Sequence, residues 1–485
     1  MNKPLRRIAI FCGLLVLALL VRTNWLQYVE ADDLNANSKN RRIQIERYAN
    51  ERGNIVVEGK AITGSVKTND TDFEYKRTYV NGPMWAPVTG YASQAFDANQ
   101  IEKIEDGILT GNSDRLFFDR TMAMFTGDKK KGGNVVTTLD AGAQKAAFEG
   151  LGDKKGAVAA IDPRTGKILA LASTPSYDPS SFAGYRDKDA KAWNALNKDK
   201  DKPMLNRALR EVYPPGSTFK VITAAAALEY GKVSDINEPT KTPDPYILPN
   251  TRTEMVNHAG GCENAPLNRA MEVSCNSVFA KLGDDVTRDK MVEMAEKFGF
   301  NSEAFVPVRT SASVYDKKMD RPQNALSSIG QFNTAATPLQ MAMVTAAIAN
   351  DGKLMKPYMI DKLESPNVDV IEQTDPEEMS RPISPENAQL LQQMMENVVE
   401  NGTGTNAAID GVKVGGKTGT AQHGENNSKN PYAWFISYAK GENGSPVAVA
   451  VVVEDSNARR DDISGGGLAA PIAKAVMNAV LESEK

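Results

Sequence analysis

The N-terminus carries the feature that most constrains this chain. Lys3, Arg6 and Arg7 precede an uncharged apolar run over residues 8–21. The run is shorter than the roughly 20 residues that span a bilayer, but Arg22 can extend its charge to the interface. No A-x-A-like cleavage site follows, which favours an uncleaved single-pass anchor over a signal peptide. We therefore expect the N-terminus inside the cell and the rest of the chain outside it.

Composition narrows the function further. The chain has 485 residues, 41% of them apolar, which is enough for more than one domain. Its formal charge of -4 argues against a nucleic-acid-binding protein. The only histidines are His258 and His423, which leaves little room for a histidine metal site or a Ser-His-Asp triad. We expect no metal and no cofactor.

Three cysteines fit an exported protein. Cys12 lies in the apolar run, so Cys262 and Cys275 are the only pair in an oxidising space. A disulfide between them and two free thiols both remain open at this point.

The chain divides into three parts that differ in composition and in sequence pattern. Residues 1–30 form a cytoplasmic tip and the membrane anchor, and residues 31–153 form a small mixed domain that we call the pedestal. The pedestal begins with a polar spacer and a strand-like segment over residues 41–65, and its composition indicates no chemistry. Residues 154–485 form the third and largest part.

The third part has the pattern of an α+β domain. Two apolar runs at 157–161 and 168–172 flank a Pro/Gly turn, which predicts a hairpin. Helices are predicted from Ser217, from Thr337-Pro338 to Ile348, and from Ala470 to Glu484. Three further strand candidates lie in "VKVGGKTGTAQ", "YAWFISYAK" and "PVAVAVVVE". This order indicates a mainly antiparallel sheet with helices packed on it.

The stretch "YPPGSTFKVITAAAALEY" places Ser217 and Lys220 at the start of an apolar helix. Residues three apart share a helix face, so the two side chains are neighbours. One interpretation is structural: Ser217 caps the helix and Lys220 extends to water. The pattern S-x-x-K is weak alone, and it recurs at Ser437 and Lys440 on a strand-like segment, where the two residues would face apart.

The alternative interpretation is a Ser/Lys pair. A serine becomes a nucleophile only when a base removes its proton, and histidine is scarce here. Burial in an apolar helix disfavours the charged form of Lys220, as would a second cation nearby. A neutral Lys220 could then deprotonate Ser217.

Two more motifs follow in order. Ser274-Cys275-Asn276 matches S-x-N, a pattern that also occurs in three polar surface-like segments. Lys417-Thr418-Gly419-Thr420 lies on a glycine-flanked, β-rich segment where a ligand backbone can lie against the strand edge. Each motif alone is weak, but the three together in this order are a strong signal.

S-x-x-K, S-x-N and K-T-G in this order resemble the penicillin-binding proteins and serine β-lactamases. The resemblance extends over "RGNIVVEGKAI", "TLDAGAQKAA", "GAVAAIDPRTGKILALASTPSYDP", "IGQFNTAATPLQMA" and "GGKTGTAQ". The short region before the transpeptidase domain is similar to the actinobacterial penicillin-binding protein A group within class B. A departure is Phe332, where relatives often carry glycine.

The resemblance implies a peptidoglycan D,D-transpeptidase that acts on the D-Ala-D-Ala end of a stem peptide and is acylated by β-lactams. It implies that Ser217 is the nucleophile and Lys220 its base. Ser274 would relay a proton to the leaving group, and Asn276 would hold the substrate amide and Lys220.

The K-T-G segment has the binding role in this family. The resemblance implies that Lys417, Thr418 and the Thr420 hydroxyl bind the terminal carboxylate, with Gly419 leaving room at the strand edge. The backbone N–H groups of Ser217 and Thr420 would form the oxyanion hole.

The sequence also bears on other functions. A β-lactamase would carry a glutamate in E-x-x-L-N after the S-x-N motif, and this sequence has none there. A carboxypeptidase and a membrane-anchored sensor or wall-binding scaffold both remain open, although sensors usually carry several membrane segments. His423 is expected to be a solvated loop residue, with substrate contact as the alternative. A lipid II polymerase is a candidate partner, and the role in division or elongation stays open.

Overall fold

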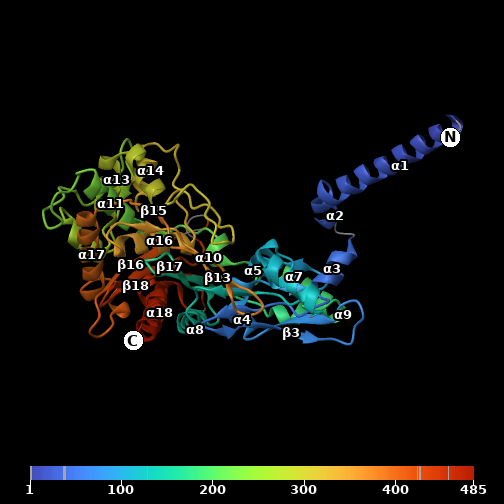
Figure 1. The fold of residues 1–485 in the computed structure, drawn as a ribbon. Coiled ribbons are helices and arrows are strands. Elements are labelled where there is room, and N and C mark those ends of the chain that lie inside the picture. The colour runs from blue at the N-terminus through green and yellow to red at the C-terminus, as the bar shows by residue number, and fades with distance from the viewer. Residues whose placement is uncertain are drawn as a thin grey trace.

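The computed structural model describes residues 3–36, 40–127, 129–422, 424, 428–456 and 458–484. A long helix, α1 (Lys3–Tyr28), extends away from the body and is followed by α2 (Ala31–Ala36) (Figure 1). The helix α1 is apolar and long enough to cross a membrane, and none of its residues is buried in the protein. Its length and composition are those that a membrane anchor requires.

After α2, the rest of the pedestal lies at one end of the body (Figure 1). Its helices are α3 (Arg41–Arg47), α4 (Gly82–Thr89), α5 (Gln100–Ile104), α6 (Asp106–Leu109), η1 (Asp114–Leu116) and α7 (Phe117–Thr126). Its strands are β1 (Ile55–Val57), β2 (Lys60–Ala61), β3 (Thr63–Lys67), β4 (Tyr75–Tyr79), β5 (Ala92–Ser93), β6 (Asp97–Ala98) and β7 (Asn134–Thr137).

The prediction of a strand-like segment over residues 41–65 is wrong for its first seven residues. Residues 41–47 form the helix α3, and strands begin only at β1. The helix fits its surroundings because Arg47, near its C-terminal end, forms ion pairs with Asp97 at 2.6 Å and Asp106 at 3.2 Å. These partners are distant in sequence, so the local alternation of residues 42–46 could not reveal them.

Two strands from the second half of the chain complete the pedestal sheet. Its order is β14-β13-β7-β1-β2, with β13 (Ile360–Glu364) antiparallel to β7 and β14 (Val370–Gln373) at the edge. The helix α8 (Ala141–Leu151) instead packs on the larger sheet of the second half. The two parts of the body therefore exchange elements across residue 153.

The larger sheet has the order β16-β17-β18-β8-β9, and all its neighbouring strands are antiparallel. The predicted hairpin is present as β8 (Lys155–Ile161) and β9 (Ile168–Thr174). The three predicted C-terminal strands are β16 (Val414–Ala421), β17 (Tyr432–Gly441) and β18 (Gly444–Asp455). The α+β class with a mainly antiparallel sheet is confirmed.

Both faces of this sheet are buried. On β18, Ala448, Ala450 and Val452 face one core, which includes α11 (Lys220–Glu229) and α16 (Pro338–Ala349). The intervening valines face a second core with α8 and α18 (Ala470–Ser483). This alternation follows from the two-residue period of a strand and explains why β18 is almost entirely apolar.

The remaining elements pack around these two cores and on a small aromatic cluster at Phe182. They are η2 (Pro179–Phe182), α9 (Asp187–Lys198), α10 (Arg207–Arg210), η3 (Gly216–Phe219), β10 (Tyr246–Ile247), β11 (Glu254–Met255), α12 (Leu267–Val273), α13 (Asn276–Val286), α14 (Arg288–Lys297), α15 (Arg321–Ser327), β12 (Leu354–Met355), β15 (Glu378–Ser380), α17 (Pro385–Glu400), η4 (Thr405–Ala407), η6 (Arg460–Asp462) and η7 (Gly465–Ala469).

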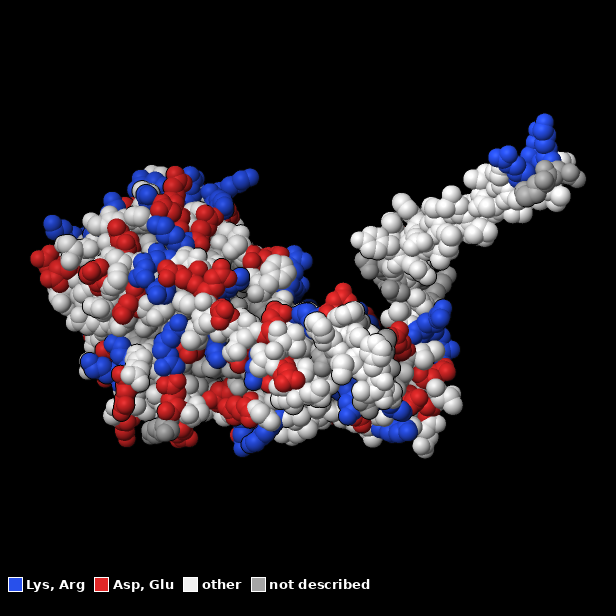
Figure 2. Space-filling model, in the orientation of Figure 1, with Lys and Arg blue, Asp and Glu red and all other residues white. Residues whose placement is uncertain are grey.

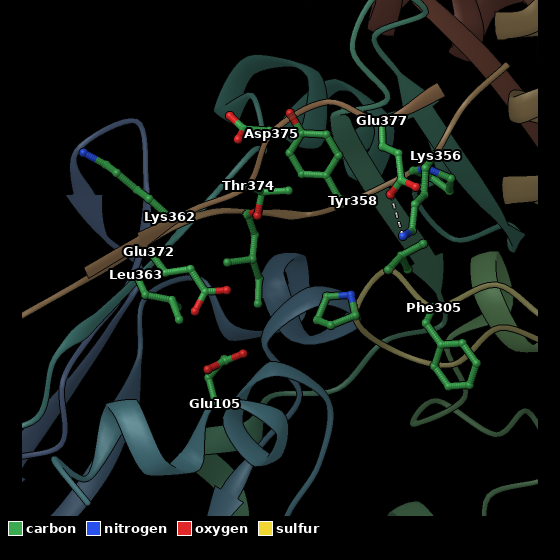
Figure 3. Close-up of a pocket in the computed structure, with 14 residues that line it drawn as sticks. Glu105, Phe305, Lys356, Tyr358, Lys362, Leu363, Glu372, Thr374, Asp375 and Glu377 are labelled. Carbon is green, nitrogen blue, oxygen red and sulfur yellow. Dashed lines mark hydrogen bonds and ion pairs between the residues drawn. The ribbon is translucent and has the colours of Figure 1, made fainter. Parts of the chain in front are cut away.

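A small pocket lies where the pedestal meets the second half of the chain. Figure 3 shows Glu105 on one side of it and Glu372 and Thr374 on the other. Its volume is about 250 Å³, and Lys356 and Glu377 form an ion pair of 2.8 Å at its rim. The acidic groups here are linked by Arg115, which contacts both Glu105 and Glu372.

Candidate active site

Ser217 lies on a tight turn at the base of α11. The turn η3 carries Gly216 to Phe219, and the α-helix proper begins at Lys220. Gly216 has a φ of +53°, and its N–H donates to the carbonyl of Gly330 at 3.0 Å. Ser217 makes no side-chain capping bond to this helix, so the capping interpretation of Ser217 is wrong. Its hydroxyl is half-buried and faces a cleft.

Lys220 is fully buried, which also excludes the interpretation that it extends to water. Its Nζ lies 2.8 Å from the carbonyl of Ser274, 3.2 Å from Ser274 Oγ and 2.7 Å from Asn276 Oδ1. All three contacts come from the S-x-N motif rather than from Ser217. The structure thus joins the first two predicted motifs through the lysine.

Ser274 has a strained backbone. It ends α12 with φ +65° and ψ +46°, a left-handed conformation that is uncommon for serine. Such strain persists only where the surroundings fix it, and it is common at functional sites. The result is that the Ser274 side chain and carbonyl both reach Lys220 while Asn276 starts α13.

Asn257 fixes the start of α13, a role that no sequence motif indicates. Its Oδ1 accepts hydrogen bonds from the backbone N–H of Asn276 at 2.6 Å and of Ser277 at 3.1 Å. Its Nδ2 donates to Asp244 Oδ1 at 2.8 Å. Asn257 therefore caps a helix from a distant loop, in a way that no local capping pattern encodes.

A disulfide closes the same segment. Cys262 and Cys275 are bonded, which settles the alternative that the sequence left open in favour of the bridge. Cys275 lies between Ser274 and Asn276, so the motif is tied to the 257–262 loop at two points. Closing a loop restricts mainly the unfolded chain, and here it also limits movement of the motif.

Lys417 joins the third motif to the other two. It lies on β16 and is fully buried, and its Nζ donates to Ser274 Oγ at 2.9 Å and to the carbonyl of Thr418 at 3.0 Å. Ser274 Oγ is therefore in contact with both lysines. Thr418 in turn shares a hydrogen bond of 2.6 Å with Thr403. Thr403 lies in a glycine-rich loop outside all three motifs.

Burial sets the charge of the two lysines. Desolvation lowers the pKa of Lys220 well below its ordinary value, and the nearby charge of Lys417 lowers it further. Desolvation also lowers the pKa of Lys417 to about 7. The site can therefore hold a neutral amine at Lys220, which is what a general base requires.

The predicted residues surround one cleft of about 890 Å³. Its lining includes Ser217, Ser274, Asn276 and the segment 418–420, whereas Lys220 and Lys417 lie buried beneath and reach it through Ser274. No hydrogen bond joins Ser217 Oγ and Lys220 Nζ among the residues that the structure describes.

Other cleft residues come from loops far away in sequence. His258, Thr403, Gly465 and Gly466 line it as well. Gly465 lies so close to β16 that a Cβ there would be 2.8 Å from the carbonyl oxygen of Gly419. The expectation for His423 falls outside the described residues.

Two family models match the chain. Residues 156–478 match the penicillin binding protein transpeptidase domain, and residues 52–135 match the penicillin binding protein A dimerisation domain. The chain is 40% identical to the peptidoglycan D,D-transpeptidase PbpA of Mycolicibacterium smegmatis, over 99% of both chains. It is 39% identical to PbpA of Mycobacterium tuberculosis, over 100% of both.

Solved structures of penicillin-binding protein A are also similar to this chain. The ceftriaxone acyl-enzyme complex of penicillin-binding protein A from M. tuberculosis is similar at a TM-score of 0.85 and 38% identity, covering 90% of this chain and 100% of that one. Its penicillin G acyl-enzyme complex is similar at a TM-score of 0.83 and 38% identity, covering 89% of this chain and 100% of that one.

Proposed function

Because the chain belongs to the penicillin-binding protein transpeptidase family, we propose that it cross-links peptidoglycan as a D,D-transpeptidase. The reaction passes through a serine acyl-enzyme, and β-lactams form a stable ester with the same serine. The substrate is the D-Ala-D-Ala end of one stem peptide, and the acceptor is an amine of another.

In the first step, Ser217 Oγ forms a bond to the carbonyl carbon of the penultimate D-Ala. The Ser217 proton passes to the neutral Nζ of Lys220, one turn along the chain. The backbone N–H groups of Ser217 and Thr420 stabilise the negative oxygen of the tetrahedral intermediate. Their hydrogen bonds, and that between Ser217 and Lys220, form when substrate enters, as is common for catalytic contacts in empty sites.

In the second step, the C–N bond breaks and the terminal D-Ala leaves as an amine. Ser274 gives its hydroxyl proton to this amine and regains one from Lys220, whose Nζ is 3.2 Å away. The acceptor amine then attacks the ester and loses a proton along the same route in reverse. Asn276 holds the amide of the acyl side and fixes Lys220 at 2.7 Å.

The K-T-G segment binds the free carboxylate that distinguishes a stem-peptide end. Thr418 and Thr420 line the cleft and offer hydroxyl groups, while Lys417 supplies positive potential from beneath. Gly419 is fully packed: a Cβ there would be 3.0 Å from the carbonyl of Pro215 and 3.1 Å from Trp434. This close packing keeps the strand beside the turn that carries Ser217.

One observation carries these roles above all. The buried Nζ of Lys220 and that of Lys417 both contact Ser274 Oγ, which itself faces the cleft beside Ser217. Two buried cations around one hydroxyl would be costly, so at least one amine is neutral. A neutral amine in contact with a hydroxyl is the basis of a proton relay.

The test is labelling by fluorescent penicillin. The wild-type chain should be labelled at Ser217, and Ser217→Ala should lose the label while retaining its thermal unfolding temperature. Ser437→Ala is the matched control, because Ser437 belongs to the second S-x-x-K pattern and is buried in β17. Persistent labelling of Ser217→Ala would contradict the assignment.

Transpeptidation must be distinguished from hydrolysis of the same acyl-enzyme. A donor stem peptide mixed with an amine acceptor should give the cross-linked product in excess over the hydrolysed one. Release of D-Ala without cross-linked product would instead support a carboxypeptidase.

We also propose the placement in the cell. The helix α1 forms a single membrane anchor with the N-terminus inside, followed by a pedestal over residues 31–153 and a transpeptidase domain over 154–485 outside. The apolar character of α1 and the three cationic residues before it support this. A membrane-bound lipid II polymerase is the proposed partner, since the cross-linked strands must be polymerised nearby.

A further inference from the structure

The pedestal helix α7 exposes an apolar face. Phe118, Met122 and Phe125 are 81%, 61% and 84% exposed, and their spacing of four and three residues places them on one side of the helix. Phe117 beside them is 57% exposed. Single exposed apolar residues are common, but three phenylalanines and a methionine together are unusual on a soluble surface.

The rest of the pedestal holds the base of α7 and leaves this face free. Leu116, which precedes the helix, is buried, and Arg115 pairs with Glu105 and Glu372. Figure 2 shows a largely uncharged surface over α7 on the face that it displays. The attachment through η1 therefore fixes the start of α7 while its apolar side points outward.

Two free cations follow the helix. Lys129 and Lys131 are exposed, and neither forms an ion pair among the residues described by the structure. Lys130 between them is partly buried and pairs with Glu46 of α3 at 3.6 Å. An amphipathic helix with phenylalanines on one face and lysines beside it has the chemistry of a segment that lies in a membrane interface.

The anchor brings this surface close to a membrane. Residues 29–40 separate α1 from α3, which limits the distance between the two helices to about 45 Å even when that segment is fully extended. The contact between Lys130 and Glu46 places the residues just after α7 beside α3, the helix that follows α2. A tether of this length makes contact with the bilayer effectively intramolecular.

We propose that α7 lies in the outer surface of the anionic membrane, with Phe118, Met122 and Phe125 among the lipid chains and Lys129 and Lys131 at the headgroups. The pedestal would then be held against the bilayer by two points, α1 and α7. This would restrict the rotation of the catalytic cleft about the anchor, which a single point of attachment cannot do.

A second copy of the chain is the competing occupant, because the family model over residues 52–135 is named for dimerisation. Pairing two α7 helices would bury the phenylalanines but would leave Lys129 and Lys131 without an opposite charge. Anionic headgroups complement both features at once, so the membrane is the better match.

The test uses the full chain in nanodiscs that contain phosphatidylglycerol, with and without bromine on the lipid chains. In a chain that also carries Trp25→Phe, the emission added by Phe125→Trp should fall about two-fold in brominated discs, because interfacial helices bury their apolar face about 5–10 Å deep. Phe305→Trp is the matched control, since Phe305 is also exposed but lies in residues 154–485, which we call the catalytic half. In the same Trp25→Phe background, the emission that Phe305→Trp adds should not change.

The lysines are tested in the same discs. Lys129→Glu combined with Lys131→Glu should reduce the quenching of Phe125→Trp and the hydrogen-exchange protection of residues 117–126. Lys318→Glu, an exposed lysine of the catalytic half, should change neither. High salt should also reduce the quenching and the hydrogen-exchange protection, because it screens the attraction between the lysines and the anionic headgroups.

Several outcomes would overturn the proposal. It rests on the anchoring by α1, and the quenching of Trp25, measured as the difference in emission between the wild-type chain and Trp25→Phe, reports that anchoring separately. If Trp25 is quenched and Phe125→Trp is not, α7 stays in water. If residues 117–126 are protected only in discs that hold two copies, a second chain covers the face. If Trp25 itself is unquenched, the anchor and the proposal fail together.

Discussion

At the residue scale, the proposed mechanism depends on the contact of two buried lysines with one hydroxyl. Ser274 Oγ lies 3.2 Å from Lys220 Nζ and 2.9 Å from Lys417 Nζ. If both amines were charged, neither could accept a proton, and their repulsion would be strong in a buried site. The charge on Lys417 therefore helps to keep Lys220 neutral, in addition to any contact that Lys417 makes with substrate.

Replacing Lys417 should change the pH dependence of acylation as well as its rate. The Lys417 charge lowers the pKa of Lys220, so Lys417→Met should raise that pKa. A higher pKa leaves less neutral Lys220 at a given pH, and the acid limb of the penicillin acylation rate should move to higher pH. Stopped-flow acylation across a pH series measures this shift.

The control for this prediction is Lys413→Met, because Lys413 lies just before the same strand but is exposed. It should leave the acid limb where it is in the wild type. An unmoved limb in Lys417→Met, with only a lower rate, would mean that Lys417 acts on substrate alone.

Asn257 offers a second prediction at this scale. Asn257→Ala removes the acceptor for two N–H groups at the start of α13, a loss that typically costs about 1 kcal/mol. Because Asn276 is the first residue of that helix, we expect the acylation rate to fall about ten-fold in a chain that still folds. Acylation kinetics and a thermal unfolding curve together measure the two effects.

A helix cap away from the site serves as the control for Asn257→Ala. Thr337 caps α16 through the N–H of Gln340, at 3.1 Å, and α16 carries none of the proposed catalytic residues. Thr337→Ala should lower stability without slowing acylation, and Asn257→Ser should restore part of the rate. Equal loss of rate in both alanine variants would show that Asn257 acts through general stability only.

At the element scale, the site is a junction between the turn η3, the strand β16 and the segment that follows α15. Gly330 lies against the turn: a Cβ there would be 2.1 Å from the carbonyl oxygen of Gly216. Gly330 also has a φ of +74°, so both space and conformation require glycine. The position of Ser217 thus depends on a residue more than 100 positions later in the chain.

We predict that Gly330→Ala displaces the turn and slows acylation about 100-fold, since displacements near 1 Å have effects of that size. Gly411 is the matched control, with the same φ of +74° and no atom within 4 Å of its Cβ position. Gly411→Ala should lose only the stability that the left-handed backbone conformation costs, and it should acylate normally. Equal rates in the two variants would show that the turn does not depend on Gly330.

The elements also show what the sequence could predict. Hairpin β8–β9, strands β16 to β18 and helices α16 and α18 were predicted because strong local patterns determine each of them. Residues 41–47 were assigned to the wrong element because their helix depends on ion pairs with residues about 50 positions away. Local periodicity contains no information about such partners.

The same distinction applies to the site. The three motifs were predictable because each packs several chemical groups into a few consecutive residues. Asn257 and Thr403 were missed because each is a single polar residue in a loop, and only the fold brings it to Asn276 or Thr418. The strain at Ser274 was equally hidden, since serine has no preference for that conformation.

At the scale of the whole molecule, pedestal and catalytic half share one apolar core. Ile55 and Val135 of the pedestal belong to the same buried cluster as Ala157 and Ile161 of the larger sheet. The strands β13 and β14 add a second link, because they leave the catalytic half and complete the pedestal sheet. We therefore expect the two parts to unfold together rather than one after the other.

A buried charge cluster in the pedestal allows this to be tested. Glu102 is fully buried and accepts hydrogen bonds from Arg52 at 2.7 Å and from Arg77 at 2.6 Å. Burial alone would raise the pKa of Glu102, but the two arginines lower it below its ordinary value. The folded state therefore gains stability above the unfolded pKa of Glu102 and loses it as the pH falls.

Glu102→Gln should leave the buried Arg77 without a counter-charge and Arg52 with only Asp106, at 2.6 Å, which costs about 3–5 kcal/mol. If the molecule is one cooperative unit, calorimetry should show a single transition at a lower temperature. Penicillin labelling, which reports the distant cleft, should be lost at that same lower temperature. Glu303→Gln, which affects only an exposed pair with Arg309, should change neither measurement. A separate early transition with labelling unchanged would mean that the shared core does not couple the two parts, and that the pedestal can unfold while the catalytic site stays intact.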